Sequence, residues 1–315
     1  MPTVVINRVT GCVVLALLAL GVVACGERAE PTGDIEQRYP VTVQGAGERP
    51  AVAPERPERI VALDPGAAEL VIALGARDRL VGIPAGIRTG DGPRRAPGTA
   101  VQVVSPNREV RVDEIARLEP DLIVATPGMD LLDLARAQRE SGAALYVQPS
   151  SSVDDVVRAT LELGFLVGEP VAARQVAEQI RTEVAAVEDR IAGLPPRTTF
   201  VDTGFFIPAP ERSLLGDLVR RAGGRSIAGA TPLPEPFPLN RLRRLNPQVY
   251  LATSESQVTL EDVRANPNTA LLRAVRRGRF AVIESELANR PGPRVGRALE
   301  QIAVALYPDA FADSR

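Results

Sequence analysis

The amino-acid sequence predicts an α/β protein with two similar lobes joined by one long helix. The first observation is a repeat, in which residues 112–126 and 239–253 share arginine, leucine, proline, alanine and threonine at matching positions without a gap. Each copy has the pattern of a short helix, a turn at the proline and a buried strand, followed by another helix and strand. The second observation is an apolar pattern at helical spacing between the copies. A helix of about 23 residues there would span about 35 Å, enough to run along both lobes.

The first residues have the pattern of a secretory signal peptide. Arg8 precedes an apolar run over residues 13–23, which is too short to span a bilayer comfortably. The run ends in Val-Val-Ala-Cys, which resembles the lipobox of bacterial lipoproteins and makes Cys25 the lipid-bearing residue at the mature N-terminus. We therefore expect a signal peptide over 1–24 and a lipidated cysteine with a flexible tether over 25–38.

The first lobe is expected over residues 39–151. A small hairpin over 39–53 leads into a strand at 59–63, a helix at 67–74 and a second strand at 80–83. Alternation of strands and helices in this order favours a parallel sheet covered by helices.

The lobes are expected to be joined through residues 152–196. Ser152 begins a helix with an acidic residue at its third position, and Pro170 suits the first turn of the next helix. The long helix is defined by apolar residues at helical spacing: Val176, Ile180, Val184, Val187 and Ile191.

The second lobe is expected over residues 197–315. It opens with a strand at 198–202, continues through a helix that begins at Ser213, and closes with a helix whose apolar face starts at Val295. This order repeats the alternation of the first lobe.

Composition excludes several classes of function. The chain has no histidine, and its two cysteines lie within the first thirty residues. The usual general base, the commonest transition-metal ligand and cysteine metal clusters are therefore missing from the body of the protein, and we expect no cofactor and no metal site. A formal net charge of −2 gives no field that would attract nucleic acid. We find no phosphate-binding glycine-rich loop and no nucleophile with a base, so we expect no enzyme.

Several segments of the sequence resemble those of a known family. Residues 57–70, which read Pro-Glu-Arg-Ile-Val-Ala-Leu-Asp-Pro-Gly-Ala-Ala-Glu-Leu, resemble the opening of the solute-binding proteins of siderophore, haem and vitamin B12 ABC importers. Similar segments follow in order through residue 311: 118–123, 222–224, 245–247, 274–279, 290–294, 299–300 and 307–308.

The resemblance implies two Rossmann-like α/β lobes, one long backbone helix and a ligand cleft between the lobes. It implies a monomer that captures a small molecule at the extracytoplasmic face of the cell membrane. The partners would be an ABC permease with its ATPase, and the membrane itself through the lipid anchor.

The resemblance also implies one exposed docking glutamate on each lobe. Glu69 matches the first of them. At the second position this sequence has Asn240, which departs from the family pattern, and Glu235 is the nearest substitute.

Ligand-facing residues are expected in the loops that follow strands, at 64–66, 84–88, 126–130, 202–207, 253–256 and 284–290. The candidates are Pro65, Arg88, Met129, Asp202, Phe205, Phe206 and Arg290. The two phenylalanines either pack under a loop or present an apolar wall, and Met129 either contacts ligand or fills the interior. The arginines either bind anionic ligand groups or form salt bridges, and Asp202 either accepts ligand hydrogen bonds or caps its loop.

The cargo is expected to be a metal chelate rather than a bare ion, because zinc and manganese sites of such proteins generally use histidines. A ferric siderophore would favour arginines, whereas a corrinoid would favour the apolar walls that Phe205 and Phe206 suggest. Haem would need an axial tyrosine, and Tyr39, Tyr146, Tyr250 and Tyr307 all fall outside the candidate loops. A membrane-anchored sensor or accessory binder without transport is the alternative that Asn240 favours.

Overall fold

The computed structural model describes residues 37–90, 95–105, 109–229 and 235–314. Residues 37–315 belong to one compact unit. Cys25, the signal peptide and nearly all of the predicted tether lie outside the described residues. Within the described residues, no helix has both the length and the apolar character needed to cross a bilayer.

The first lobe is built on a five-stranded parallel sheet with the order β5-β4-β3-β6-β7. Its strands are β3 (Ile60–Ala62), β4 (Leu80–Pro84), β5 (Val101–Val104), β6 (Leu122–Ala125) and β7 (Ala144–Val147). The helices α2 (Pro65–Ala73), α3 (Val112–Arg117) and α4 (Leu131–Ser141) pack on it, and β1 (Val41–Val43) pairs with β2 (Ala51–Ala53) as the predicted hairpin. All residues of β3 and β6 are buried, as expected for parallel strands covered on both faces.

Local sequence explains where α2 begins and ends. The Asp64 carboxylate accepts a hydrogen bond from the Gly66 N–H at 2.8 Å, and Pro65 occupies the first helical position. Gly75 follows the helix with a φ of +84°, a conformation that glycine adopts without steric cost. The C-terminal end of β3 is thereby joined directly to the N-terminus of α2.

The second lobe is built on a four-stranded parallel sheet with the order β11-β10-β8-β9. Its strands are β8 (Arg197–Asp202), β9 (Gly224–Ser226), β10 (Val249–Thr253) and β11 (Phe280–Ile283). The α-helices are α7 (Leu214–Arg221), α8 (Leu239–Leu245), α9 (Leu260–Ala265), α10 (Arg273–Arg276), α11 (Ser285–Ala288) and α12 (Val295–Leu306).

The two sheets confirm that the sequence repeat is structural. The order β4-β3-β6-β7 in the first lobe corresponds to β9-β8-β10-β11 in the second, with β6 and β10 at equivalent places. Glu119 and Asn246 occupy the same position of the repeat, directly before its proline, and have φ values of +43° and +44°. The same left-handed turn therefore joins helix to strand in both lobes.

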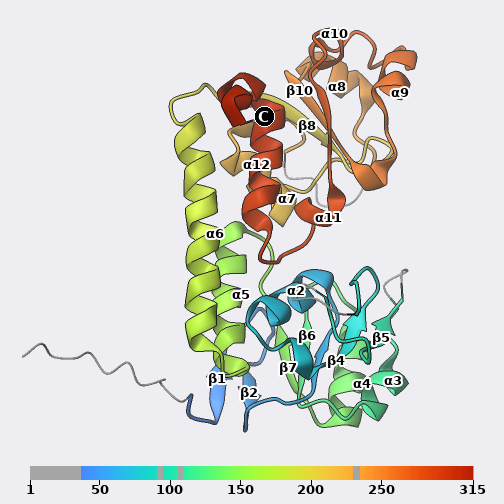
Figure 1. Ribbon diagram of the computed structural model, residues 1–315. Helices are drawn as coiled ribbons and strands as arrows, with labels where there is room; N and C mark the ends of the chain where they lie inside the picture. Colours follow the sequence, from blue (N-terminus) through green and yellow to red (C-terminus); the bar gives the residue numbers. More distant parts are fainter. Residues whose placement is uncertain (1–36, 91–94, 106–108, 230–234, 315) are drawn as a thin grey trace, which may run out of the picture. The chain divides into compact units, whose positions relative to one another are not determined.

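Two helices connect the lobes, α5 (Val153–Leu166) and α6 (Pro170–Ile191). The Ser152 hydroxyl caps α5 by accepting from the Asp155 N–H at 3.0 Å, and Pro170 opens α6, as the sequence predicts. Figure 1 shows α6 running along both lobes, with the shorter α5 beside its lower half. The Leu163 end of the pair packs into the first-lobe core, and the end with Val156 and Val187 packs into the second-lobe core. The helix α6 is continuous over 22 residues and connects the two lobes like a brace.

Gly164 allows the close approach of α5 and α6. A Cβ atom on Gly164 would lie 2.1 Å from the Ala173 Cβ, far inside van der Waals contact. Gly164→Ala is therefore expected to lower the free energy of unfolding by about 1–3 kcal/mol, although alanine is the better helix former. Urea unfolding would measure the loss, and adding Ala173→Gly should recover most of it. Equal stability of Gly164→Ala and the parent would contradict this packing.

Candidate functional site

The carboxyl ends of the two parallel sheets line a common cavity of about 280 Å³. Residues from the first lobe follow β3, β6 and β7, and residues from the second lobe follow β8 and β11. They are Asp64, Thr126, Pro127, Ser150, Ser151, Arg212, Ser213, Leu214, Leu215, Asn289 and Pro291. Open α/β sheets bind ligands outside the carboxyl ends of their strands, so this cavity is the candidate binding cleft.

The backbone at Pro291 of the second lobe contacts the first lobe beside the cavity. The Gln148 side chain is fully buried and donates from Nε2 to the Pro291 carbonyl oxygen at 2.6 Å. A Cβ atom on Gly66 would lie 2.8 Å from the carbonyl carbon and oxygen of Pro291, so this approach requires glycine at position 66. The segment around Pro291 is thus the point where the second lobe meets the first.

Glu69, Arg290 and Arg294 form a charged cluster across the lobes, which we call the Glu69 clasp. The Glu69 carboxylate accepts from Arg290 Nη1 at 3.0 Å, from Arg294 Nε at 2.9 Å and from Arg294 Nη2 at 2.7 Å. The Glu69 and Arg290 side chains are only 16% and 14% exposed. Hydrogen bonding to Glu69 raises the pKa of Arg294 above its ordinary value, so this guanidinium keeps its positive charge.

The clasp places two of the predicted site residues in contact with each other. Glu69 is not the exposed glutamate that the family resemblance implies, because the second lobe places two guanidinium groups on its carboxylate. Arg290 pairs with Glu69 and, at 3.4 Å, with Glu286. Of the two interpretations of Arg290, the salt bridge is present, within and between the lobes, and the ligand contact stays a prediction.

Asp202 organises the loop that follows β8. Its fully buried carboxylate accepts from the Gly204 N–H at 2.8 Å, the Phe206 N–H at 3.0 Å and the Tyr250 hydroxyl at 2.5 Å. Burial raises the pKa of Asp202 above its ordinary value, against the opposing effect of the three hydrogen bonds. Of the two sequence interpretations, the geometry favours the loop cap.

The two adjacent phenylalanines have different environments. Phe205 is 83% exposed, whereas Phe206 packs against the second-lobe core. Both residues have positive φ, +51° and +63°, in a region where a residue with a Cβ is strained by about 1–2 kcal/mol. The sequence interpretation treated the two phenylalanines alike, as both packed under a loop or both facing a ligand. In the structure only Phe206 packs against the core.

The other predicted residues are dispersed around the strand ends. Pro65 is half-buried in the first turn of α2, Met129 is half-buried against the first-lobe interior, and Arg88 is exposed. Glu235 and Asn240 are both exposed before and within the first turn of α8.

Two segments at the cavity were not among the predicted ligand-facing loops. They are the loop after β7, with Gln148, Ser150 and Ser151, and residues 212–215. A predicted strand precedes residues 148–151, so the strand-end rule that found the other loops could have found this one.

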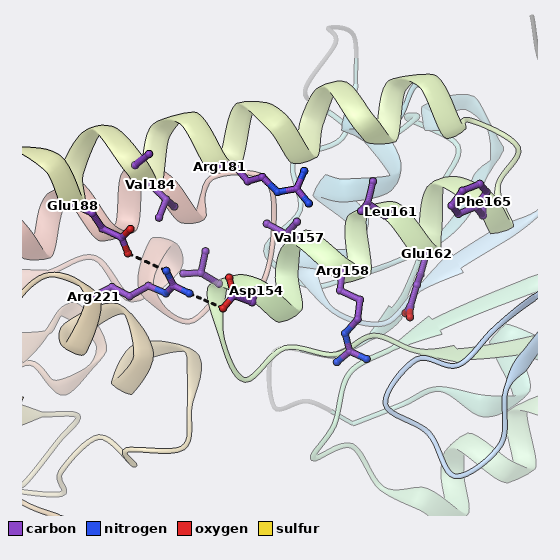
Figure 2. Close-up of a pocket in the computed structure, with 12 residues that line it drawn as sticks. Asp154, Val157, Arg158, Leu161, Glu162, Phe165, Arg181, Val184, Glu188 and Arg221 are labelled. Carbon is purple, nitrogen blue, oxygen red and sulfur yellow. Dashed lines mark hydrogen bonds and ion pairs between the residues drawn. The ribbon is translucent and has the colours of Figure 1, made fainter.

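A larger hollow, of about 550 Å³, lies along α5 and α6 and away from the strand ends (Figure 2). Val157, Leu161 and Val184 contribute apolar surface. Arg221, at the end of α7, pairs there with Glu188 at 2.9 Å and Asp154 at 2.6 Å. The charges in this hollow are therefore already partnered within the chain, and it lies on the brace between the lobes rather than at a strand edge.

The described residues contain no cluster of three or more carboxylate, cysteine or histidine side chains that could hold a metal ion. Among the polar side chains that line the cavity, the hydroxyl and amide groups outnumber the two charged groups, Asp64 and Arg212. Such a lining can donate and accept hydrogen bonds to an organic ligand.

The chain is similar to several known proteins. A family model described as "Periplasmic binding protein" matches residues 60–287. A cobalamin-binding protein of Halobacterium salinarum is 25% identical over 285 residues, which cover 85% of this chain and 74% of that protein. An uncharacterised ABC transporter substrate-binding lipoprotein of Bacillus subtilis is 22% identical over 315 residues, covering 95% and 97%. The crystal structure of a periplasmic vitamin B12-binding protein of Vibrio cholerae superimposes with a TM-score of 0.68 at 22% identity, covering 81% of this chain and 98% of that one.

Proposed function

The chain belongs to the periplasmic binding protein family, and from that premise we propose that it captures a metal chelate outside the cytoplasmic membrane and delivers it to an ABC importer. The observation that carries the proposal is the cavity between the carboxyl ends of two parallel sheets, lined from both lobes. A ligand there contacts both halves of the protein at once. The proposal includes no catalytic step, in keeping with the binding-protein family.

The chemistry of the chain favours a complete chelate over a bare ion. Histidine is absent from the sequence. All four tyrosine hydroxyls make hydrogen bonds within the protein: Tyr39 to the Leu166 carbonyl, Tyr146 to Glu162, Tyr250 to Asp202, and Tyr307 to the Pro195 and Gly223 carbonyls. Haem ligation by tyrosine would have to break one of these bonds. The cargo must therefore bring its own metal ligands.

Among chelates, a corrinoid fits the described cavity better than an anionic siderophore. Arg212 is the one arginine that lines the described cavity, and Arg290 is neutralised by Glu69. Hydroxyl and amide groups are suited to uncharged amide side groups on a ligand. The relative from H. salinarum, named as a cobalamin-binding protein, supports the same choice.

Attachment to the membrane is proposed through Cys25, after removal of residues 1–24, with residues 25–38 as tether. The B. subtilis relative, named as a lipoprotein, supports this anchor. Two acyl chains would make the attachment stable. The protein would then work as a monomer at the extracytoplasmic face, within reach of its permease and ATPase.

Docking to the permease is proposed through Glu69 and Glu235. Glu235 is exposed and accessible, whereas permease arginines could reach Glu69 only by displacing Arg290 and Arg294. Asn240 is exposed but uncharged. This asymmetry keeps one alternative open, a membrane-anchored sensor or accessory binder without transport.

A thermal-shift screen of the full chain in detergent tests the proposal. The panel contains cyanocobalamin and its precursors, ferric siderophores, haem and free metal ions. One chelate class is expected to stabilise the protein, by about 2.7 kcal/mol at a hundred times its dissociation constant, while free ions leave it unchanged. Ser151→Trp, which fills the cavity, should abolish the shift, whereas Thr42→Trp on the exposed side of β1 should keep it.

No stabilisation by any chelate would contradict the proposed cargo class. A ligand shift without uptake of that labelled ligand by cells expressing the chain with its permease would favour the sensor.

A further inference from the structure

The three most exposed large apolar side chains in the described part of the chain all lie in segments that follow the carboxyl ends of sheet strands. Leu131 and Leu132 are 77% and 81% exposed and follow β6 of the first lobe, and Phe205 is 83% exposed and follows β8 of the second. Thr126, at the end of β6, lines the cavity, and so does Arg212, beyond the β8 loop. Exposed apolar side chains near cavity-lining segments in the sequences of both lobes, which we call the two rims, are candidate ligand contacts.

The outward direction of Phe205 is imposed by its loop. Asp202 fixes the backbone N–H groups of Gly204 and Phe206, and the Phe206 carbonyl accepts from the Phe237 N–H at 2.8 Å. Phe206 packs inward against the core, so the strained left-handed backbone leaves its neighbour in solvent. Strain that surrounding contacts maintain is common at binding sites.

The two leucines on the opposite lobe are equally constrained. The Asp130 carboxylate caps α4 by accepting from the Leu132 N–H at 2.8 Å and the Asp133 N–H at 3.1 Å. The inward face of α4 is supplied by Leu134 and Ala137, which are buried. Leu131 and Leu132 therefore add nothing to the core, and their exposure is a fixed feature of the helix N-terminus.

Cavity size shows why the rims matter. The cavity of about 280 Å³ lies just below the range for drug-sized ligands, roughly 300–1,000 Å³. A macrocyclic chelate would exceed it and extend over the rims. Its uncharged polar groups would meet the hydroxyl and amide lining, and its apolar surface would meet the exposed leucines and phenylalanine.

We infer that Phe205 and the Leu131–Leu132 pair are opposing apolar contacts that select a macrocyclic chelate with an apolar surface and uncharged polar side groups. This inference rests on the proposed function and adds its specificity-determining residues, one set on each lobe. Such a ligand is distinguished from a compact, anionic chelate, which would gain nothing from these side chains.

The test is isothermal titration of the full chain in detergent with cyanocobalamin and with a ferric trihydroxamate siderophore. Phe205→Ser and the double variant Leu131→Ser/Leu132→Ser are each expected to weaken cyanocobalamin binding by about 10- to 100-fold. The matched control is Leu271→Ser, at a 67% exposed leucine between α9 and α10, which should change affinity by less than about twofold. Because all four side chains are exposed, the variants should fold like the parent.

The outcomes separate this inference from the proposed function. If the parent binds neither chelate, the proposed cargo class fails and this inference fails with it. If the parent binds a chelate and both rim variants bind it as tightly as Leu271→Ser, the inference is overturned while the carrier function stands. Loss of affinity on one rim alone overturns the two-sided contact.

Discussion

Replacement of Asp202 by alanine is expected to lower the free energy of unfolding by about 3–5 kcal/mol. The change leaves three donors without their acceptor, the N–H groups of Gly204 and Phe206 and the buried Tyr250 hydroxyl. Each unsatisfied buried donor costs about 1–3 kcal/mol. Equilibrium urea unfolding followed by circular dichroism would measure the loss.

Two variants distinguish the cap from simple packing. Tyr250→Phe removes one donor and keeps the ring in the core, so it should cost about 1 kcal/mol. Loss from Asp202→Ala no greater than from Tyr250→Phe would contradict the view that this carboxylate holds the loop.

The acid side of the stability curve gives an independent check on Asp202. Burial raises its pKa in the folded protein above the unfolded value, so the folded state keeps its proton to higher pH. Stability from this group is then fully present below the unfolded pKa of about 3.9 and is lost as pH rises through the folded pKa. The free energy of unfolding of the parent, measured relative to that of Asp202→Asn, should therefore fall as pH rises from the unfolded pKa through the folded pKa. A gain of parent stability with rising pH would mean that hydrogen bonding outweighs burial.

Breaking the Glu69 clasp is the second large effect. Glu69→Ala is expected to cost about 2–4 kcal/mol, because it leaves two guanidinium groups facing each other with little solvent around Arg290. The figure lies below that for a fully buried pair, since the Arg294 side chain is 35% exposed. Urea unfolding measures the cost, and small-angle scattering of the same samples should report wider separation of the lobes.

Glu286→Ala is the matched control for the clasp. Glu286 also pairs with Arg290, at 3.4 Å, but its side chain is 70% exposed and it belongs to the same lobe. Its loss should change stability by less than about 0.5 kcal/mol and leave the scattering unchanged. Equal effects of the two variants would show that the clasp does not hold the lobes together.

Local patterns in the sequence were sufficient for the architecture. Ser152 and Pro170 were identified as helix starts from residue type and spacing alone, and both have those roles. The repeat predicted equivalent strands, and β6 and β10 occupy equivalent places in their sheets. These features depend on interactions between residues close in sequence, whose geometry the backbone fixes.

The candidate site was predicted less completely. The strand-end rule located the loops after β3, β6, β8 and β11, because parallel strands bring their carboxyl ends to one edge. Which side chains face the cleft could not be read from those loops. Leu131 and Leu132 were not among the predicted site residues, and their exposure follows from the helix cap at Asp130 and from the burial of Leu134.

By itself the sequence determined two α/β lobes, a long connecting helix, a body without histidine or cysteine, and the family. The burial and the interaction partners of the site residues are decided only by the tertiary structure. Glu69 meets Arg290 across 221 positions of the chain, and Asp202 meets Tyr250 across 48. No local pattern encodes such contacts, because the first depends on how the two lobes pack and the second on how distant strands pair in one sheet. The burial and charge pairing of Glu69, which the sequence predicted to be exposed, exist only after that packing.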